Sequence, residues 1–132
     1  MDVAVLFDDR HITARLPENA QRMPLPKRIN ALVKLHGTPL MVISRQVLNQ
    51  EYQRFRRLLP RVRLFYAIKA NPHPDILSLL ARLGSCFDVA SVQETLAVLA
   101  AGATSERISY GNTIKKESEI AAAFKLSITQ FA

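Results

Sequence analysis

Apolar residues along the chain follow two different spacings, and from residue 62 onward the two alternate. Short continuous apolar runs are typical of strands buried on both faces, whereas apolar residues three and four apart are typical of a helix with one buried face. The runs predict strands at residues 62–71, 86–91, 107–112 and 127–132. The helical spacings between them predict helices at residues 74–84, 92–102 and 115–125.

A helix after each strand, with short connections, predicts parallel strands joined by right-handed crossovers and therefore an α/β fold. Eight such units over about 250 residues close a β/α barrel, and four or five suffice for an open doubly wound sheet. The chain reaches Ala132 within its fourth predicted strand. We expect an N-terminal portion of a larger architecture, or one partner of a split one, because an uncovered strand leaves an apolar sheet edge.

Residues 1–61 are less regular. Residues 1–26 hold three of the seven prolines and show no sustained period, which predicts a short strand or arm and an extended lead-in. The following segments are predicted as a helix, a buried strand and a second helix, at residues 27–36, 38–44 and 45–59. We divide the chain into an N-terminal arm and helix, residues 1–37, and the strand–helix units of residues 38–132.

The composition is that of one folded domain: 132 residues, of which 48% are hydrophobic. No apolar run approaches the roughly 20 residues of a membrane-spanning helix, and the N-terminus MDVAVLFDDRH has acidic residues where a signal peptide has basic ones. We therefore expect a cytoplasmic protein without a membrane partner.

The single cysteine, Cys86, lies in an apolar stretch and is expected in the core. We expect no metal site, because the histidines are scattered and are interpreted as surface or loop residues: His11, His36 and His73.

The formal net charge of +7 comes entirely from the first half of the chain. Residues 1–63 hold 12 Lys and Arg against 5 Asp and Glu, whereas residues 64–132 hold 6 of each. The excess is concentrated in RFRRLLPRVR, residues 54–63. Such a run is typical of a solvated helix face, and the alternative is a patch that binds an acidic partner such as nucleic acid. The run has a single aromatic residue and no accompanying DNA-binding motif, so the solvated face is favoured and no nucleic-acid partner is expected.

Candidate chemistry lies where the predicted strands end, because functional groups of parallel β/α folds gather at the carboxyl ends of the strands. Lys69 and Asp88 end adjacent strands, and an ion pair between them would offset part of the cost of burying each. Small and apolar neighbours favour a desolvated Lys69 that can form a Schiff base with an aldehyde. The alternative is a lysine whose stem packs at the strand end while its ammonium reaches water. The third strand ends in two further candidates, Tyr110 and Asn112.

The stretch YAIKANPHPDILSLLARLG, which contains Lys69, resembles the pyridoxal-phosphate attachment signature of the ornithine, diaminopimelate and arginine decarboxylases of alanine-racemase-like fold. The matching positions around the lysine are Tyr66, Ala67, Ala70, Asn71 and Gly84. GSCFDVASVQE, ERISYGNTIKKESEIAAA and ITQFA resemble the second, third and fourth barrel strands of that family. The form YGNTIKK looks closer to ornithine or lysine decarboxylases than to diaminopimelate decarboxylases. The resemblance covers residue 38 onward and implies a partial TIM-type barrel, with the N-terminal segment associated with the family's β-domain.

The resemblance also implies roles for individual residues. Lys69 would hold pyridoxal phosphate as an internal aldimine, Asp88 would lie beside the lysine and the cofactor, and Ala67 would pack under the cofactor ring. Glu94 would belong to the groups that orient the site; alternatively it only completes a capping box with Ser91. The substrate would be an amino acid, ornithine or lysine, in polyamine biosynthesis, and the full-length family forms homodimers.

Other parts of such an active site come from later strands and from a second subunit in the family. We therefore expect the chain to be incomplete as an enzyme unless further sequence or a complementing chain supplies them. Two alternatives remain beside an ornithine or lysine decarboxylase. One is a fragment of a diaminopimelate decarboxylase, and the other is a non-catalytic relative that binds a partner through the exposed barrel edge.

Overall fold

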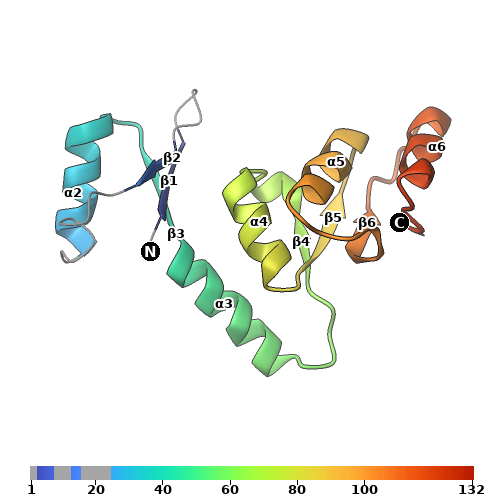
Figure 1. The fold of residues 1–132 in the computed structure, drawn as a ribbon, viewed down its shortest axis with the longest axis horizontal. Coiled ribbons are helices and arrows are strands. Elements are labelled where there is room, and N and C mark those ends of the chain that lie inside the picture. Colours follow the sequence, from blue (N-terminus) through green and yellow to red (C-terminus); the bar gives the residue numbers. More distant parts are fainter. Residues whose placement is uncertain (1–2, 8–12, 16–24) are drawn as a thin grey trace. The chain divides into compact units, whose positions relative to one another are not determined.

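A computed structural model describes residues 3–7, 13–15 and 25–132 of the chain (Figure 1). They form two compact units, Met1–Glu51 and Tyr52–Ala132, which are described separately below. His11 and the predicted lead-in at residues 16–24 lie outside the described residues. Within the described residues, no helix has the length and apolar character needed to cross a membrane.

The described residues of the first unit include a three-stranded antiparallel sheet and a helix. Its strands are β1 (Val3–Phe7), β2 (Thr13–Arg15) and β3 (Met41–Ser44), and β1 is central. Helix α2 (Leu25–His36) ends where Gly37 takes a φ of +77° and donates its N–H to the Val33 carbonyl at 2.8 Å. The predicted helix is thus confirmed. The predicted buried strand at residues 38–44 is half-exposed instead, because β3 pairs with β1 at the edge of this small sheet.

The second unit is a four-stranded parallel sheet in the order β4-β5-β6-β7. Its strands are β4 (Phe65–Ala67), β5 (Cys86–Val89), β6 (Ile108–Tyr110) and β7 (Gln130–Phe131). Helices connect them in turn: α4 (Pro74–Arg82), α5 (Val92–Ala100) and α6 (Glu117–Lys125). Short 3₁₀ turns, η1 (Ile68–Ala70) and η2 (Ser105–Arg107), follow β4 and precede β6. The predicted strand–helix order and parallel pairing are confirmed, although the strands are shorter than predicted.

Helix α3 (Arg45–Leu58) leads into the second unit, as predicted for residues 45–59. Its apolar residues at helical spacing predict one buried face, yet Tyr52 is its only buried residue. Val47, Phe55 and Leu58 are each more than half exposed. The helix therefore exists where the spacing predicts it, but most of its apolar face is not covered within the described residues.

The pairing register of the parallel sheet divides its side chains between two faces. Residues directly paired across adjacent strands point to the same side, and neighbours along a strand point to opposite sides. One face carries large apolar side chains: Tyr66, Phe87, Val89, Ile108, Tyr110 and Phe131. The other carries mostly small or polar ones: Phe65, Ala67, Cys86, Asp88, Ser109 and Gln130.

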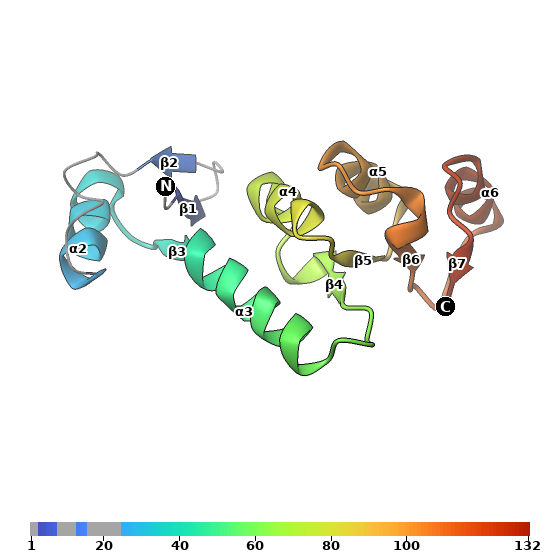
Figure 2. The same ribbon diagram turned by 60° about the horizontal axis from the view of Figure 1, so that its bottom comes forward.

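Helices α4, α5 and α6 all lie on one side of the sheet (Figure 2). This is the apolar face, because the hydroxyl of Tyr110 reaches the carboxylate of Glu119 on α6 at 3.4 Å. The core of the unit lies between them, with Phe87, Val98 and Ile128 almost wholly buried. Each such side chain contributes about 1.5–3 kcal/mol by leaving water, so this layer supplies most of the stabilisation. The polar face, with Asp88, is the side without these helices.

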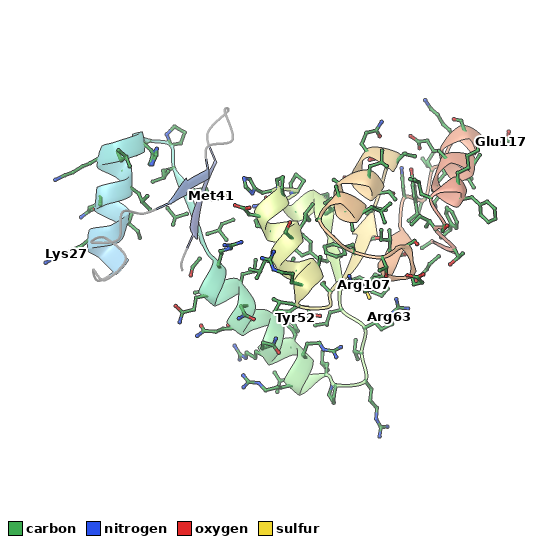
Figure 3. The ribbon with its side chains drawn as sticks, viewed as in Figure 1. Lys27, Met41, Tyr52, Arg63, Arg107 and Glu117 are labelled. Carbon is green, nitrogen blue, oxygen red and sulfur yellow. The ribbon has the colours of Figure 1, made fainter. Side chains whose placement is uncertain are left out.

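Two arginines hold the amino-terminal end of the sheet together (Figure 3). Arg107 donates to the carbonyls of Ala81 (2.9 Å) and Gly102 (3.3 Å), where α4 and α5 end. A cation at these two helix ends also complements their dipoles. Arg63 donates to the Glu106 carbonyl at 2.9 Å and lies over the ring of Phe65 at 5.1 Å.

This arrangement modifies the interpretation of the basic run at residues 54–63. Helix α3 ends at Leu58, so Arg61 and Arg63 do not belong to a helix face. Arg63 is instead committed to the sheet, where its guanidinium also lies 3.5 Å from the sulfur of Cys86. Cys86 is buried, as its apolar context predicted.

Replacing Arg107 with Met, which keeps the length of the stem, should lower the free energy of unfolding by about 2–3 kcal/mol. The carbonyls that it binds would lose charge-assisted hydrogen bonds, of which the part-buried one to Ala81 contributes roughly 1.5–3 kcal/mol and the exposed one to Gly102 less. Urea unfolding followed by circular dichroism measures the change. The matched control is Arg82→Met, which removes an exposed cation from the last turn of α4. Equal losses in the two variants would show that Arg107 acts only by its charge.

The three tyrosines should also make stability fall at alkaline pH. Burial raises the pKa of Tyr52, Tyr66 and Tyr110 above the usual value of about 10. A pKa that is higher in the folded state than in the unfolded state means that the fold favours the protonated phenol. The stability that the folded state gains from this preference is complete below pH about 10, and it is lost as the pH rises through the folded pKa values. An absorbance titration of phenolate should find no tyrosine ionising at the free value until the chain unfolds. A tyrosine that titrates normally in the folded chain contradicts this expectation.

Candidate functional site

The candidate site lies at the carboxyl edge of the parallel sheet, where the sequence predicted it. Strand β4 ends at Ala67, and Lys69 follows in the middle of the single 3₁₀ turn η1. Asp88 lies in β5 as the register partner of both Ala67 and Ser109. Lys69 therefore follows the strand by two residues, whereas the sequence placed it within the strand.

The turn that carries Lys69 is held through Asn71. Its N–H donates to the Ile68 carbonyl (3.1 Å), and its own carbonyl accepts a hydrogen bond from the Tyr66 hydroxyl (3.1 Å). The Asn71 side-chain oxygen accepts the N–H of His73 (3.1 Å). His73 in turn accepts the N–H of Asp75 (3.2 Å) and so caps α4. The backbone around Lys69 is thus fixed on both sides.

His73 does not have the surface or loop position predicted for it. Only 7% of the residue is exposed, because the ring turns inward to cap the first turn of α4. The sequence carried a signal for this role, since Pro74 at the first helical position makes the preceding residue the cap.

The side chain of Lys69 is exposed, and it forms no ion pair with Asp88 among the described residues. The expected desolvated and paired lysine is therefore not what the structure contains. Strand β4 ends before Lys69, so the turn carries the side chain out of the apolar layer. The geometry matches the alternative in which the ammonium reaches water.

Asp88 leans along the sheet toward β6. An ideal Cβ built on Gly111 would lie 2.9 Å from Cγ and 3.1 Å from Oδ2 of Asp88, and closer still to Oδ1. The half-buried carboxylate thus occupies the space that a side chain at position 111 would fill. Within the described part of the chain it makes no hydrogen bond or ion pair.

The backbone just after β5 is clamped from two directions. The N–H of Ala90 donates to Oε2 of Glu94 (2.5 Å), and the carbonyl of Ala90 accepts a hydrogen bond from Nδ2 of Asn112 (3.3 Å). Ser91 caps α5 by accepting the N–H of Glu94 at 3.2 Å. Ser91 is therefore the predicted cap, but the Glu94 carboxylate reaches Ala90 rather than the N–H of Ser91 that a capping box uses. Glu94 and Asn112 both fix the end of β5.

Tyr110 belongs to the core and does not face this edge. It is fully buried, its ring stacks on Phe131 with the ring centres 5.9 Å apart, and its hydroxyl points to α6. Burial is the main cause of its raised pKa, and the nearby Glu119 carboxylate adds to it. Lys115 is half-buried: its ammonium lies 5.8 Å from the Tyr110 ring centre and donates to the Ala132 carbonyl.

Sequence reasoning missed Gly111 and Arg107. A glycine directly after a strand signals the close approach of another group, and this signal could have identified Gly111. Arg107 gave no comparable signal, because its acceptor in α4, the Ala81 carbonyl, lies 26 residues away in the sequence. No group of three or more His, Cys, Asp or Glu that could hold a metal is found among the described residues.

Residues 45–132 match the family model described as "Pyridoxal-dependent decarboxylase, pyridoxal binding domain". The match spans 88 of the 132 residues and includes every element of the parallel sheet. The chain therefore belongs to the pyridoxal-dependent decarboxylases, as the resemblance around Lys69 indicated. The cofactor of this family is pyridoxal phosphate, with which a related structure was solved.

Curated relatives extend the comparison. The chain is 42% identical over 105 residues to a lysine/ornithine decarboxylase of Selenomonas ruminantium, covering 80% of this chain and 27% of the relative. It is 37% identical over 115 residues to a diaminopimelate decarboxylase of Vibrio cholerae, covering 85% and 26%. The chain thus spans only about a quarter of the length of these relatives.

A solved structure gives the same fold. The lysine/ornithine decarboxylase of Vibrio vulnificus, complexed with putrescine, superposes with a TM-score of 0.73 at 31% identity. The likeness covers 78% of this chain and 28% of that structure. The α/β fold is therefore that of part of a TIM-type barrel, as predicted.

Replacing Tyr66 with Phe should loosen the turn that carries Lys69. The change removes the hydrogen bond to the Asn71 carbonyl and leaves the edge-to-face contact with Phe87, whose ring centre lies 6.4 Å away. We expect a loss of about 1 kcal/mol in stability and faster amide hydrogen exchange of the peptide that spans residues 68–71. Tyr52→Phe is the matched control, and it should leave exchange at residues 68–71 unchanged. Unchanged exchange in both variants would contradict a role for the Tyr66 hydroxyl.

Proposed function

We propose that this chain provides the cofactor-attachment part of a pyridoxal-phosphate-dependent decarboxylase that acts on lysine or ornithine, with Lys69 as the attachment residue. One observation carries the proposal: Lys69, at the same edge of the sheet as Asp88, presents an exposed amine that is unpaired among the described residues, on a turn whose backbone is fixed. The match over residues 45–132 supports the assignment of the cofactor.

The residues present fit the cofactor. A primary amine without a partner can react with an aldehyde, and the Asp88 carboxylate has unused acceptor capacity. Ala67 carries only a methyl group on the same face as Asp88 and leaves room for a flat ring. When bound, pyridoxal phosphate takes up the electron pair that remains on the α-carbon as CO₂ leaves.

The proposed roles follow from these positions. Lys69 binds the cofactor through Nζ, which must be unprotonated to react. Asp88 accepts a proton or a hydrogen bond at its carboxylate when the cofactor is present. Ala67 forms the surface under the ring. Glu94 positions the end of β5 through Ala90 and does not touch the reacting atoms in this proposal.

The substrate and assembly are inferred from relatives. A lysine/ornithine decarboxylase and a structure complexed with putrescine favour a basic amino acid and a diamine product, and thus polyamine synthesis. We further propose a homodimer, with the remaining active-site groups coming from further sequence or from a complementing chain. A diaminopimelate decarboxylase is the second candidate because a relative of 37% identity has that activity in its name.

Reduction with borohydride after addition of pyridoxal phosphate should label Lys69 in the 132-residue chain, as read by peptide mass spectrometry. Lys69→Arg keeps the charge and should abolish the label at this peptide, while Lys125→Arg, on the surface of α6, should leave it unchanged. A folded chain in which exposed lysines are labelled equally would contradict attachment at Lys69.

The same reaction tests the substrate class. An amino acid recognised by the chain should compete with Lys69 for the cofactor and reduce its labelling. We expect L-lysine or L-ornithine to reduce it at lower concentration than meso-diaminopimelate. The opposite order would favour the second candidate.

A further inference from the structure

The backbone at Gly111 does not require a glycine. Glycine is favoured where φ is positive, and the described glycines in that region are Gly37, Gly84 and Gly102. Gly111 is not among them, so an alanine could adopt its backbone conformation without strain. The reason for a glycine at this position must therefore be the space around it.

That space is filled by a single side chain. The three atoms nearest to an ideal Cβ on Gly111 all belong to the carboxyl group of Asp88. Real Cβ atoms essentially never approach another heavy atom closer than 3.0 Å, and two of these three distances are shorter than that. A methyl group at position 111 and the observed Asp88 conformation therefore exclude each other.

The backbone around the space next to Gly111 is held by hydrogen bonds. The N–H of Gly111 donates to the Val89 carbonyl at 2.8 Å, one residue beyond Asp88. On the other side of that carbonyl, Ala90 is held by both Glu94 and Asn112. Strands β5 and β6 thus cannot separate easily to admit a methyl group, and the Asp88 side chain must turn instead.

The other direction in which the Asp88 side chain can turn is toward β4. A side chain moves between a few staggered rotamers, and the neighbour of Asp88 across the sheet in that direction is Ala67, whose methyl group leaves room. Lys69 follows Ala67 by two residues. A carboxylate turned away from Gly111 therefore moves toward the side of the sheet that carries the Lys69 amine.

We propose that Gly111 is a positioning residue: because it lacks a side chain, the Asp88 carboxylate can lie toward β6, and the Lys69 amine is left without an anionic neighbour. An amine next to a carboxylate stays protonated and reacts more slowly with an aldehyde. The inference rests on the proposed function, because only there does the Lys69 amine react with the aldehyde of a cofactor. Before the cofactor binds, Lys69 is thus kept free, and Asp88 is kept available for the cofactor.

The test measures the reactivity of Lys69 with acetic anhydride, which needs no cofactor. The rate of acetylation of Lys69 is read by peptide mass spectrometry at one mildly alkaline pH, relative to Lys125 in the same chain. Gly111→Ala should lower this ratio about fivefold, because a carboxylate at about 4 Å in water-like surroundings stabilises an ammonium by roughly that factor. Asp88→Ala alone should change it less than twofold, since the carboxylate already lies away from the amine.

The double variant, Gly111→Ala with Asp88→Ala, closes the cycle. It should restore the ratio of the unmodified chain. The inference would be overturned by an unchanged ratio in Gly111→Ala, or by a ratio that is equally low in Gly111→Ala and in the double variant. If Gly111→Ala fails to fold while the double variant folds, the competition between the methyl group and Asp88 is supported. If neither folds, position 111 needs glycine for another reason and the inference fails.

Failure of this inference is distinguishable from failure of the proposed function. Absence of the borohydride label in the unmodified chain concerns attachment of pyridoxal phosphate and leaves the acetylation ratios intact. Conversely, a clear label on Lys69 with no effect of Gly111→Ala would retain the cofactor assignment and remove the positioning role of the glycine.

Discussion

The parallel register of β4, β5, β6 and β7 is the constraint on which the rest of the second unit depends. Because paired residues point to one side, it sends Phe87 and Tyr110 toward the helices and Ala67 and Asp88 to the opposite face. A shift of one residue in one strand would exchange these sets and place a carboxylate in the apolar layer. The stability of the core and the position of the candidate site are thus consequences of the same hydrogen bonds.

The two edges of the sheet use polar groups in different ways. At the amino edge, Arg107 and Arg63 bind carbonyl groups where helices and turns end, so their charges are committed to the scaffold. At the carboxyl edge, the backbone is fixed by neutral groups and by Glu94, while Lys69 and Asp88 have no partners among the described residues. This separation is what a site needs: rigid supports, with reactive groups that are left available for a ligand.

The position of Lys69 bears on how such a lysine becomes reactive. Burial disfavours the charged ammonium and so favours the neutral, reactive amine, but it also limits the access of a cofactor. An exposed amine is accessible, and its protonation depends on the charges around it. The strand ends early, so the turn carries Lys69 outward, and Tyr66 and Asn71 hold that turn. In the role that we propose for Gly111, the placement of neighbouring charge, rather than burial, controls the amine before a cofactor arrives.

The sequence alone determined the order of helices and strands in the second unit, the parallel pairing, the edge at which Lys69 and Asp88 gather, and the family. These follow from apolar spacing and from a contiguous motif, which are local properties. Only the tertiary structure decided that Lys69 is exposed, that Asp88 turns to Gly111, that His73 is buried and that Arg107 joins two helix ends. Each of these depends on which side chains from distant segments share a space, and no local pattern contains that information.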